Sequence, residues 1–513
     1  RRKKYICGRS KALIMRTVLV LMDTLRREAL SCYNPETIVK TPNIDAFAKE
    51  ATVFDQHWIG SAPCMPARRD ILTGRLNFLE RSWGPIEPFD ITLPKVLRDH
   101  DVYTHITTDH CHYMRTGGEG YLQQFNTWDY HRGQEGDPWV SRIDEPDNMP
   151  ETFYGRVRRQ YQLNRTQWPN EEDMPSPKTF ASACEWLEDN KGDDDFFLMV
   201  EAFDPHEPFD VPDKYMDLYG GNTGLDRDYY EIPQYKRVSE AGVPESAVDY
   251  VQRRYAALVT MTDHWFGTLI NKLKELDMYE DTMVVMTTDH GYFLGERDYL
   301  GKNYMHLYNE LAHLPLIIKF PHGERAGEHV QQITQNIDMM PTILDFMGIE
   351  IPDSVQGVSL KPLAQDPQAK TKDYAIFGYH GMAVNLSDGH HTYLRAPKPE
   401  NQPCYEYTAF PTTIRRVLGV ECPEKIEMGR YFKRTQYPLF RIPITKPGII
   451  DQSDEPLKEV LETKLFDICA DYGQTKNLAG VDSELEARYI ELLSQALDAY
   501  DAPQEQKERL GIQ

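Results

Sequence analysis

The chain has 513 residues, enough for one large α/β unit with an appended subdomain or for about two to three domains. Hydrophobic residues at 40% and charged residues at 27% are typical of a soluble globular protein, and no apolar run approaches the roughly 18 residues that span a membrane. The formal net charge of −23 repels nucleic acid at long range, so we expect no nucleic-acid partner and expect any anionic substrate to be bound by local positive charge.

The N-terminus and the cysteines indicate the compartment. The chain begins with a basic run, residues 1–4, but residues 5–15 are interrupted by Gly8 and Lys11 and do not form the apolar core of a signal peptide. The eight cysteines have no paired spacing, so they fit neither a disulfide scaffold nor a zinc ribbon. They indicate buried thiols in a reducing compartment. We therefore expect a cytoplasmic location and no membrane association.

Short β-branched and apolar runs predict buried parallel strands. They occupy residues 17–22, 102–106, 196–200, 283–286 and 314–320. Helices are predicted between them from capped starts or helical periodicity, at Thr41-Pro42, at Thr92-Leu93-Pro94 and over residues 246–277. Strands that alternate with helices indicate an α/β fold with a largely parallel sheet covered on both faces.

Polar side chains lie just beyond the carboxyl ends of four of these strands. They are Asp23, Thr107 with Thr108, Asp204 to His206, and Asp289 with His290. Open α/β sheets bind their ligands at the carboxyl ends of the strands. We therefore expect these four segments to meet at one edge of the sheet.

Two regions have a different pattern. Residues 109–180 show little periodicity and many aromatic and Arg residues, which predicts an insertion ordered over the sheet edge within a catalytic domain of residues 1–370. Residues 371–513 contain shorter strand-like pieces and Pro-rich connections, and they end in a predicted helix near 483–500. This pattern predicts a smaller α+β subdomain.

The most specific stretch is CMPARRDILTGR, which starts at Cys64. Pro66 suits the first turn of a helix and Gly74 suits its end, so Cys64 is predicted at a helix N-terminus, where free backbone N–H groups favour an anion. Arg68 lies one turn further on the same helical face and can hold a neighbouring oxygen or the substrate anion. A cysteine at a helix start is more often a buried packing residue, so the pattern up to this point leaves both interpretations open.

Acidic strand ends predict a metal site. Hard divalent cations prefer oxygen ligands, and an Asp that follows a buried strand is held rigidly enough to provide one. Asp23 occupies such a position, and Asp289 with His290 supplies a carboxylate and an imidazole after another strand. A lone Asp there is more often a turn residue or a helix cap, but the second acidic strand end favours a metal.

These segments resemble the type I sulfatases, a formylglycine-dependent family of the alkaline-phosphatase-like superfamily. CMPARRDILTGR is similar to the family's C-x-P-x-R…L-x-T-G signature, with Ala67 where Ser is usual. Asp289-His290-Gly291 with residues 294–296 resembles the family's D-H-G…L-G-E segment, and residues 465–479 resemble its closing element. The resemblance spans nearly the whole chain and implies an alkaline-phosphatase-like α/β sandwich, with a large mostly parallel sheet flanked by helices and a smaller C-terminal α+β subdomain with an antiparallel sheet.

The resemblance also implies a cofactor and a modified residue. Cys64 would be oxidised to formylglycine by a formylglycine-generating maturation enzyme, and a hydroxyl of its hydrate would attack sulfur. Asp23, Asp289, His290 and the group derived from Cys64 would hold a divalent metal, which is calcium by resemblance to the family. The family commonly has a second acidic residue where this chain has Thr24, and the missing carboxylate and the nitrogen ligand leave manganese and zinc open.

Catalytic roles follow for three further residues from the same resemblance. Arg68 and Lys302 would neutralise the sulfate oxygens. His206 stands in the family's P-H-x-P-[FW] element, here Asp204 to Phe209, and would contact the sulfate or protonate the leaving oxygen.

The segment from Thr107 to Tyr113 stands where many family members have G-K-W-H, and it lacks the lysine. His110 would take over that catalytic role, and we expect Thr108, His112 and Arg115 to bind substrate. These side chains could instead be ordinary loop groups bonded to backbone.

Aromatic residues and arginines are interleaved along the predicted insertion. They are Tyr113, Tyr121, Trp128, Tyr130, Trp139 and Trp168, with Arg115, Arg132, Arg142 and Arg156. Aromatic faces stack on sugar rings and Arg binds carboxylates or sulfates, so we predict a sulfated carbohydrate as substrate. The alternative is that these aromatic side chains only pack the insertion onto the sheet.

The sequence therefore predicts a hydrolase of sulfate monoesters, with two alternatives. A phosphonate monoester or phosphodiester hydrolase of the same superfamily would use the same nucleophile, and the phosphonate branch also lacks the second acid at the position of Thr24. From another functional class, the chain could be a sulfoglycan-binding protein with unmodified Cys64. A mutase or an alkaline phosphatase would need Ser or Thr in place of Cys64 and more metal ligands.

Overall fold

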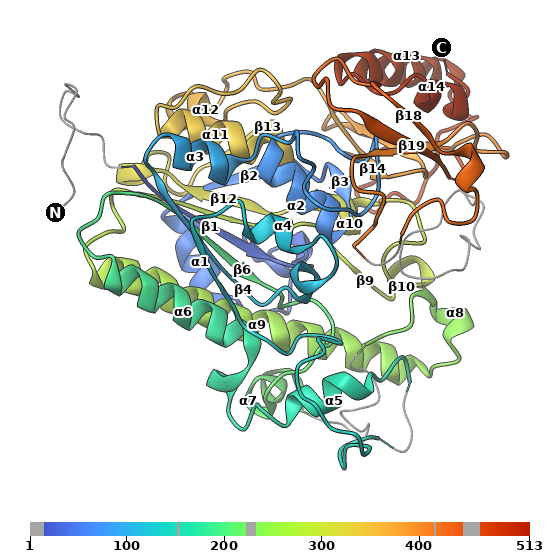
Figure 1. Ribbon diagram of the computed structural model, residues 1–513. Helices are drawn as coiled ribbons and strands as arrows, with labels where there is room; N and C mark the ends of the chain where they lie inside the picture. The colour runs from blue at the N-terminus through green and yellow to red at the C-terminus, as the bar shows by residue number, and fades with distance from the viewer. Residues whose placement is uncertain (1–14, 151–153, 222–231, 415–416, 445–461, 513) are drawn as a thin grey trace, which may run out of the picture.

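The computed structural model describes residues 15–150, 154–221, 232–414, 417–444 and 462–512. A nine-stranded sheet runs through the centre of this described part, with strand order β11-β2-β12-β8-β1-β6-β4-β5 and with β13 paired to β2 (Figure 1). The strands are β1 (Met15–Met22), β2 (Thr52–Trp58), β4 (Tyr103–Thr108), β5 (Thr127–Tyr130), β6 (Asp195–Ala202), β8 (Thr282–Thr287), β11 (His313–Leu314), β12 (Leu316–Lys319) and β13 (His329–Gln335).

The middle of the sheet is parallel, as the alternation of strands and helices predicted. β1 pairs in parallel with β6 on one side and with β8 on the other, and β4 pairs in parallel with β6. The predicted strand at 314–320 forms two pieces, β11 and β12, because Pro315 between them has no N–H for the ladder. Both pieces run antiparallel to β2. The carboxyl ends of β1, β4, β6 and β8 therefore lie at the same edge.

Helices cover both faces of this sheet (Figure 1). Val18, Val20 and Met22 of β1 belong to the core shared with α1 (Pro42–Lys49), α6 (Pro175–Asp189) and α9 (Glu245–Glu275). Leu19 and Leu21 belong to the core shared with α2 (Cys64–Thr73), α3 (Leu93–Asp99) and α11 (Met339–Phe346). Successive side chains of a strand point to opposite faces, so a continuous apolar run is what a strand buried on both faces requires.

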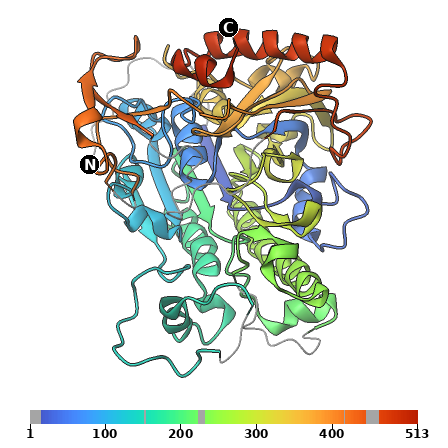
Figure 2. The ribbon, with the colours of Figure 1, turned by 90° about the vertical axis from the view of Figure 1, so that its right-hand side faces the viewer.

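A second sheet packs beside the first (Figure 2). Its strand order is β20-β16-β15-β14-β3. Its strands are β3 (Ser61–Ala62), β14 (Ala375–Tyr379), β15 (Val384–Ser387), β16 (His391–Arg395) and β20 (Lys464–Asp467), and α13 (Ser483–Ala499) with α14 (Glu505–Leu510) covers one face. The prediction of a smaller C-terminal region with an antiparallel sheet is confirmed. β3 joins this sheet in parallel to β14 from the segment just before Cys64, so the second sheet contacts the predicted nucleophile segment directly.

The remaining elements are short. Two three-stranded sheets are formed by β7 (Lys236–Arg237), β10 (Tyr299–Gly301) and β9 (Phe293–Leu294), and by β17 (Tyr405–Thr408), β19 (Leu439–Pro443) and β18 (Glu427–Gly429). The other α-helices of the described residues are α4 (Glu119–Leu122), α5 (Arg159–Arg165), α7 (Asp213–Met216), α8 (Val238–Ala241), α10 (Asn309–Ala312) and α12 (Lys361–Gln365).

The region predicted as an insertion, residues 109–180, contains a strand that the sequence prediction lacked. β5 pairs in parallel with β4 and forms one edge of the main sheet. Part of this region is therefore a strand of the central sheet and not only a cover over its edge.

In the described parts of the chain, no helix has the length and apolar character needed to cross a membrane. The seven cysteines within those parts are free thiols, and five of them are buried, as the sequence predicted. The basic N-terminal run lies outside the described residues.

Candidate active site

Cys64 begins α2, as predicted. Gly74 ends the helix with φ of +64°, a left-handed conformation that glycine adopts without strain, and its N–H bonds to the Asp70 carbonyl at 2.8 Å. The Asp70 carboxylate accepts hydrogen bonds from the backbone N–H and the hydroxyl of Ser61, which ties the second half of the helix to β3. Burial raises the pKa of the Cys64 thiol well above its usual range, and a neutral buried thiol is a weak nucleophile.

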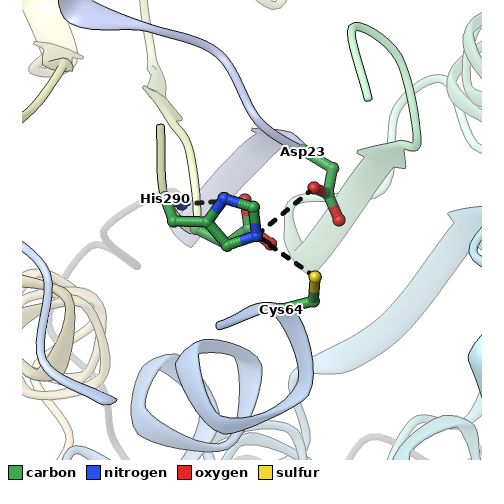
Figure 3. A group of neighbouring side chains, drawn as sticks. Asp23, Cys64 and His290 are labelled. Carbon is green, nitrogen blue, oxygen red and sulfur yellow. Dashed lines mark hydrogen bonds and ion pairs between the residues drawn. The ribbon is translucent and has the colours of Figure 1, made fainter. Parts of the chain in front are cut away.

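Four side chains, that of Cys64 included, converge from the ends of two strands and the start of one helix. Asp23 follows β1, Asp289 and His290 follow β8, and Cys64 begins α2. Figure 3 shows Asp23, His290 and Cys64 pointing toward one another. Each offers one ligand atom, these atoms lie within 4.8 Å of one another, and all four residues are buried. His290 Nε2 lies 3.1 Å from Cys64 Sγ and 3.8 Å from Asp23 Oδ1.

The imidazole of His290 has one nitrogen available for a ligand. Its Nδ1 lies 2.8 Å from the carbonyl oxygen of Gly291, which can only accept, so Nδ1 carries the hydrogen and Nε2 faces the cluster with its lone pair. Burial, mainly, lowers the pKa of His290, which keeps the ring neutral. A Cβ at Gly291 would lie 1.9 Å from the Glu310 carbonyl oxygen, so only glycine allows the chain to pass here.

The donor set fits a divalent cation. Burial alone would raise the pKa of Asp23, but Arg68 and Lys302 hold it below its usual range, so the carboxylate is ionised. Thr24 adopts φ of +67°, which is unusual for a β-branched residue. In this conformation its hydroxyl donates to Asp23 Oδ1 at 2.7 Å, and its backbone N–H donates to Asp289 Oδ1 at 3.1 Å. An ionised carboxylate offers about four acceptor sites, so both Asp residues keep lone pairs for a metal.

Arg68 is the central cation of this cluster and is fully buried. Its Nη2 lies 2.8 Å from Asp23 Oδ2, its Nη1 lies 2.6 Å from Asp289 Oδ2, and its Nε bonds to Glu201. Nη1 also donates to the Cys64 carbonyl at 3.0 Å. The predicted proximity of Arg68 to Cys64 is therefore present, and its guanidinium additionally holds three carboxylates together.

Lys302 brings a second positive charge to the cysteine. Its Nζ lies 3.2 Å from His290 Nε2, 3.6 Å from Cys64 Sγ and 3.4 Å from the Thr24 hydroxyl. Burial alone would lower the pKa of Lys302, but the neighbouring Cys64 and Glu207 raise it to about 12. At neutral pH the cluster therefore faces an ammonium group that can bind an anion.

Two of the predicted histidines line the same cluster. His110 Nδ1 lies 3.8 Å from Asp23 Oδ2 and 3.5 Å from Arg68 Nη2. His206 Nδ1 bonds to the carbonyl of Glu207, so Nδ1 carries the hydrogen and the lone pair is on Nε2. Burial, the largest cause, lowers the pKa of both rings well below the usual value, and both are neutral.

The residues predicted to bind substrate, Thr108, His112 and Arg115, are not part of the cluster around Cys64. The Thr108 hydroxyl donates to Glu201 at 3.0 Å and accepts the His110 backbone N–H, so its bonds are made within the protein. His112 is buried with Nδ1 at 3.3 Å from His110 Nε2, which places it behind His110. Arg115 follows this segment and is partly exposed, outside the cluster of Asp23, Cys64, Asp289 and His290.

The aromatic side chains of residues 109–180 divide into two groups. Tyr113 and Tyr121 are fully buried, and their hydroxyls donate to Glu201 and to the Gly84 carbonyl. The prediction that these two stack on sugar rings is therefore wrong, because their faces pack in the core. Trp128 on β5 is 44% exposed, and Tyr130, Trp139 and Trp168 are partly exposed.

Comparison with known proteins identifies the family. Residues 16–349 match the protein family described as Sulfatase, which covers more than half of the chain. The chain belongs to the sulfatase family. The resemblance seen in CMPARRDILTGR and in Asp289-His290-Gly291 is thus confirmed, together with the predicted class of enzyme, a hydrolase of sulfuric esters.

Individual relatives of this sulfatase act on different esters. The N-acetylglucosamine-6-O-sulfatase of Bacteroides thetaiotaomicron is 24% identical over 423 residues, which cover 71% of this chain and 73% of that protein. A structure solved in complex with its substrate D-glucosamine-2-N,6-O-disulfate has a TM-score of 0.64 at 18% identity and covers 96% of this chain and 99% of its own. The phosphonate monoester hydrolase of Agrobacterium radiobacter has a TM-score of 0.65 at 17% identity, with 96% of both chains covered. These two structures establish the alkaline-phosphatase-like fold.

Sequence reasoning missed one member of this sulfatase site, Glu201. The residue lies near the end of β6, fully buried, with Oε2 bonded to the Thr108 hydroxyl and Oε1 bonded to Arg68 and to the Tyr113 hydroxyl. The predicted strand stopped at Val200, one residue earlier. The available signal was an acidic residue inside an apolar run, because a carboxylate buried in a central strand requires a cation as partner.

Replacing Glu201 with glutamine is expected to lower the free energy of unfolding of this sulfatase by about 1–3 kcal/mol, because Arg68 loses one buried charged partner while it keeps Asp23 and Asp289. Urea unfolding measures the change, and steady-state kinetics should show a lower kcat. The matched control is Glu185→Gln on the exposed side of α6. A variant as stable and as active as the control would show that Glu201 does not position Arg68.

Proposed function

We propose that this sulfatase hydrolyses a sulfate monoester on a carbohydrate through a formylglycine derived from Cys64 and a divalent metal. The observation that carries the proposal is the position of Cys64 Sγ, at the start of α2, 3.1 Å from His290 Nε2 and 3.6 Å from Lys302 Nζ, within the group that includes Asp23 and Asp289. An unmodified, neutral thiol would serve poorly there as a nucleophile. The family signature around Cys64 supports its conversion to formylglycine by a maturation enzyme.

The metal would be held by Asp23, Asp289 and His290 together with the group derived from Cys64. When bound, it would lower the pKa of the attacking hydroxyl and polarise the sulfate. Resemblance to the family favours calcium. An all-oxygen site would favour calcium. The imidazole of His290, and Thr24 in place of a second acidic residue, shift the preference towards manganese or zinc.

The proposed reaction has two steps. One hydroxyl oxygen of hydrated formylglycine bonds to sulfur while the bond from sulfur to the alcohol oxygen breaks, and the alcohol leaves with a proton. The second hydroxyl then gives up its proton, the carbon–oxygen bond to the sulfate breaks, and the aldehyde returns. Lys302 and Arg68 supply the positive charge that the sulfate oxygens need.

The leaving alcohol takes its proton from His206 or His110. Both imidazoles are neutral in this structure, so each has to accept a proton before it can give one. Lys302 keeps its own proton, because its pKa is raised to about 12, and its charge helps to lower the pKa of both rings. Arg68 stays protonated, because three carboxylates stabilise its charge.

Side-by-side kinetics test the ester preference. We expect kcat/KM for sulfated sugars and aryl sulfate to exceed kcat/KM for phenyl phosphonate and a phosphodiester by about tenfold or more. One observation favours the phosphonate alternative: the site has Thr24 and a histidine where further carboxylates could stand. A preference for phenyl phosphonate would contradict our proposal. Tight binding of sulfated glycans without turnover would instead support the sulfoglycan-binding alternative.

Removal of the metal is expected to abolish turnover and to lower the unfolding temperature, because Asp23 and Asp289 lose a shared cation. Dialysis against a chelator, followed by reloading with calcium, manganese or zinc, measures both effects, and elemental analysis should find about one divalent ion per chain. In an Asp289→Asn variant the bound metal should fall in parallel with activity. Full activity in protein shown to hold no divalent metal would contradict the proposed site.

A further inference from the structure

Glu207 has an unusual position beside the cluster. It is the variable residue of the P-H-x-P-[FW] element and is 1% exposed. One carboxylate oxygen, Oε1, accepts the hydroxyl hydrogen of Tyr235, whereas Oε2 has no hydrogen-bond partner. His206 Nδ1 lies 3.3 Å from Oε2, but its hydrogen bonds to the backbone carbonyl of Glu207. A buried carboxylate oxygen that accepts no hydrogen bond from the protein can accept one from a ligand.

Asn303 carries a second set of unpaired atoms. It follows Lys302 directly, is 7% exposed, and has no hydrogen-bond partner for Oδ1 or for Nδ2. Its φ of +82° and the bond from its backbone N–H to the Tyr379 hydroxyl at 3.3 Å fix its position. Tyr379 ends β14 and is near enough to Cys64 for that thiol to affect its charge, so Asn303 lies where the second sheet meets the active site.

Both residues border Lys302, the cation next to Cys64. Glu207 affects the charge of Lys302 directly, and Asn303 is its neighbour in the chain. The sulfate of a substrate bound at Cys64 would be held by Lys302, so the alcohol that carries the sulfate extends towards these two side chains. A carboxylate only accepts hydrogen bonds, and an amide both accepts and donates. Together they match hydroxyl groups, each of which donates and accepts.

We infer that Glu207 and Asn303 bind hydroxyl groups of the alcohol that carries the sulfate, and so select a polyhydroxylated leaving group such as a sugar. This inference rests on the proposed sulfatase function and specifies its substrate. Glu135, whose charge also acts on Glu207, adds a second carboxylate near this position. The two acidic groups disfavour a further sulfate or carboxylate at the hydroxyl-binding position, so the bound hydroxyls are unsulfated.

The wild-type enzyme alone provides the first test. We would compare kcat/KM for monosulfated glucose, galactose and N-acetylglucosamine with kcat/KM for their deoxy analogues and for nitrophenyl sulfate. Loss of a bound hydroxyl leaves Glu207 or Asn303 unpaired, so the matching deoxy analogue should react about 10- to 100-fold more slowly. Wild-type rates that do not change on removal of any ring hydroxyl would overturn the inference.

Two variants then assign the hydroxyls. Glu207→Gln keeps an acceptor for Tyr235 but replaces the free acceptor with a donor, and Asn303→Gly removes the side chain without strain at positive φ. In each variant the ratio of kcat/KM for the sugar sulfate to kcat/KM for nitrophenyl sulfate should fall about tenfold or more. The matched control is Glu240→Gln, an exposed residue of α8.

The outcomes distinguish a failure of this inference from a failure of the proposed carbohydrate sulfatase function. Ratios within about twofold of wild type in both folded variants, with sugar sulfates still hydrolysed, would overturn the role of Glu207 and Asn303 and leave the carbohydrate sulfatase proposal standing. Hydrolysis of nitrophenyl sulfate with no turnover of any sugar sulfate would overturn both. In the variant that lacks the side chain which bound the missing hydroxyl, the deoxy analogue should react no more slowly than its parent sugar.

Discussion

A Cys64→Ala variant is expected to lose sulfatase turnover by about 10⁴-fold or more, because it lacks the side chain from which the nucleophile is made. Alanine is a strong helix former and fits the buried start of α2, so the variant should fold. Steady-state kinetics with the best sulfate ester measure the loss, and thermal unfolding verifies the fold. The control is Cys184→Ala, a buried thiol of α6 in the opposite core.

The serine variant at the same position adds a sharper outcome. Cys64→Ser offers one hydroxyl to attack sulfur but no second hydroxyl whose deprotonation expels the sulfate. We expect at most one turnover per chain, with the sulfate left on the introduced serine side chain as a mass increase of the intact protein. A Cys64→Ala variant with kcat/KM within about tenfold of wild type would show that another group is the nucleophile.

The second large effect is expected for Arg68→Ala, which should lower the free energy of unfolding by about 3–5 kcal/mol. The substitution leaves the carboxylates of Asp23, Asp289 and Glu201 buried and close together without their shared cation. Denaturant unfolding of metal-free protein measures the change. Arg69→Ala is the matched control, because Arg69 lies on the same helix and pairs with the single carboxylate of Asp90.

The pH dependence of stability should reverse sign in this variant. In the wild type the pKa of Asp23 lies below its unfolded value, so its contribution is present above about pH 4 and is lost as the pH falls. Without Arg68, repulsion and burial raise the pKa values of the cluster above their unfolded values, so the variant loses stability as the pH rises from about 4 to 7. An Arg68→Ala protein as stable as Arg69→Ala, with unchanged pH dependence, would contradict the role assigned to Arg68.

The sequence predicts the centre of this site well, for a local reason. Asp23 directly follows one continuous apolar run and Asp289 lies three residues beyond another. Such runs identify strands buried on both faces without knowledge of their partners. Once the strands are parallel neighbours, their carboxyl ends share an edge, and the side chains that follow them must meet. The helix that starts at Cys64 is likewise encoded within its own segment by Pro66 and Gly74.

What the sequence does not predict depends on contacts between distant segments. β5 is a short edge strand whose pairing with β4 has no local pattern, so its region reads as an insertion. Thr108 and Tyr113 bind Glu201 across two strands, and no spacing in the chain shows that their hydroxyls are already bonded. The unpaired oxygen of Glu207 and the unpaired amide of Asn303 become visible only when all of their neighbours are in place.

Mass spectrometry of the peptide that contains Cys64 tests the central claim most directly. Purified enzyme would be prepared with and without a formylglycine-generating maturation enzyme, digested, and assayed in parallel for sulfatase turnover. We predict that the aldehyde form of the peptide is present in active preparations and that its fraction rises in proportion to specific activity. A fully active preparation in which the Cys64 peptide carries only the unmodified thiol would contradict the account.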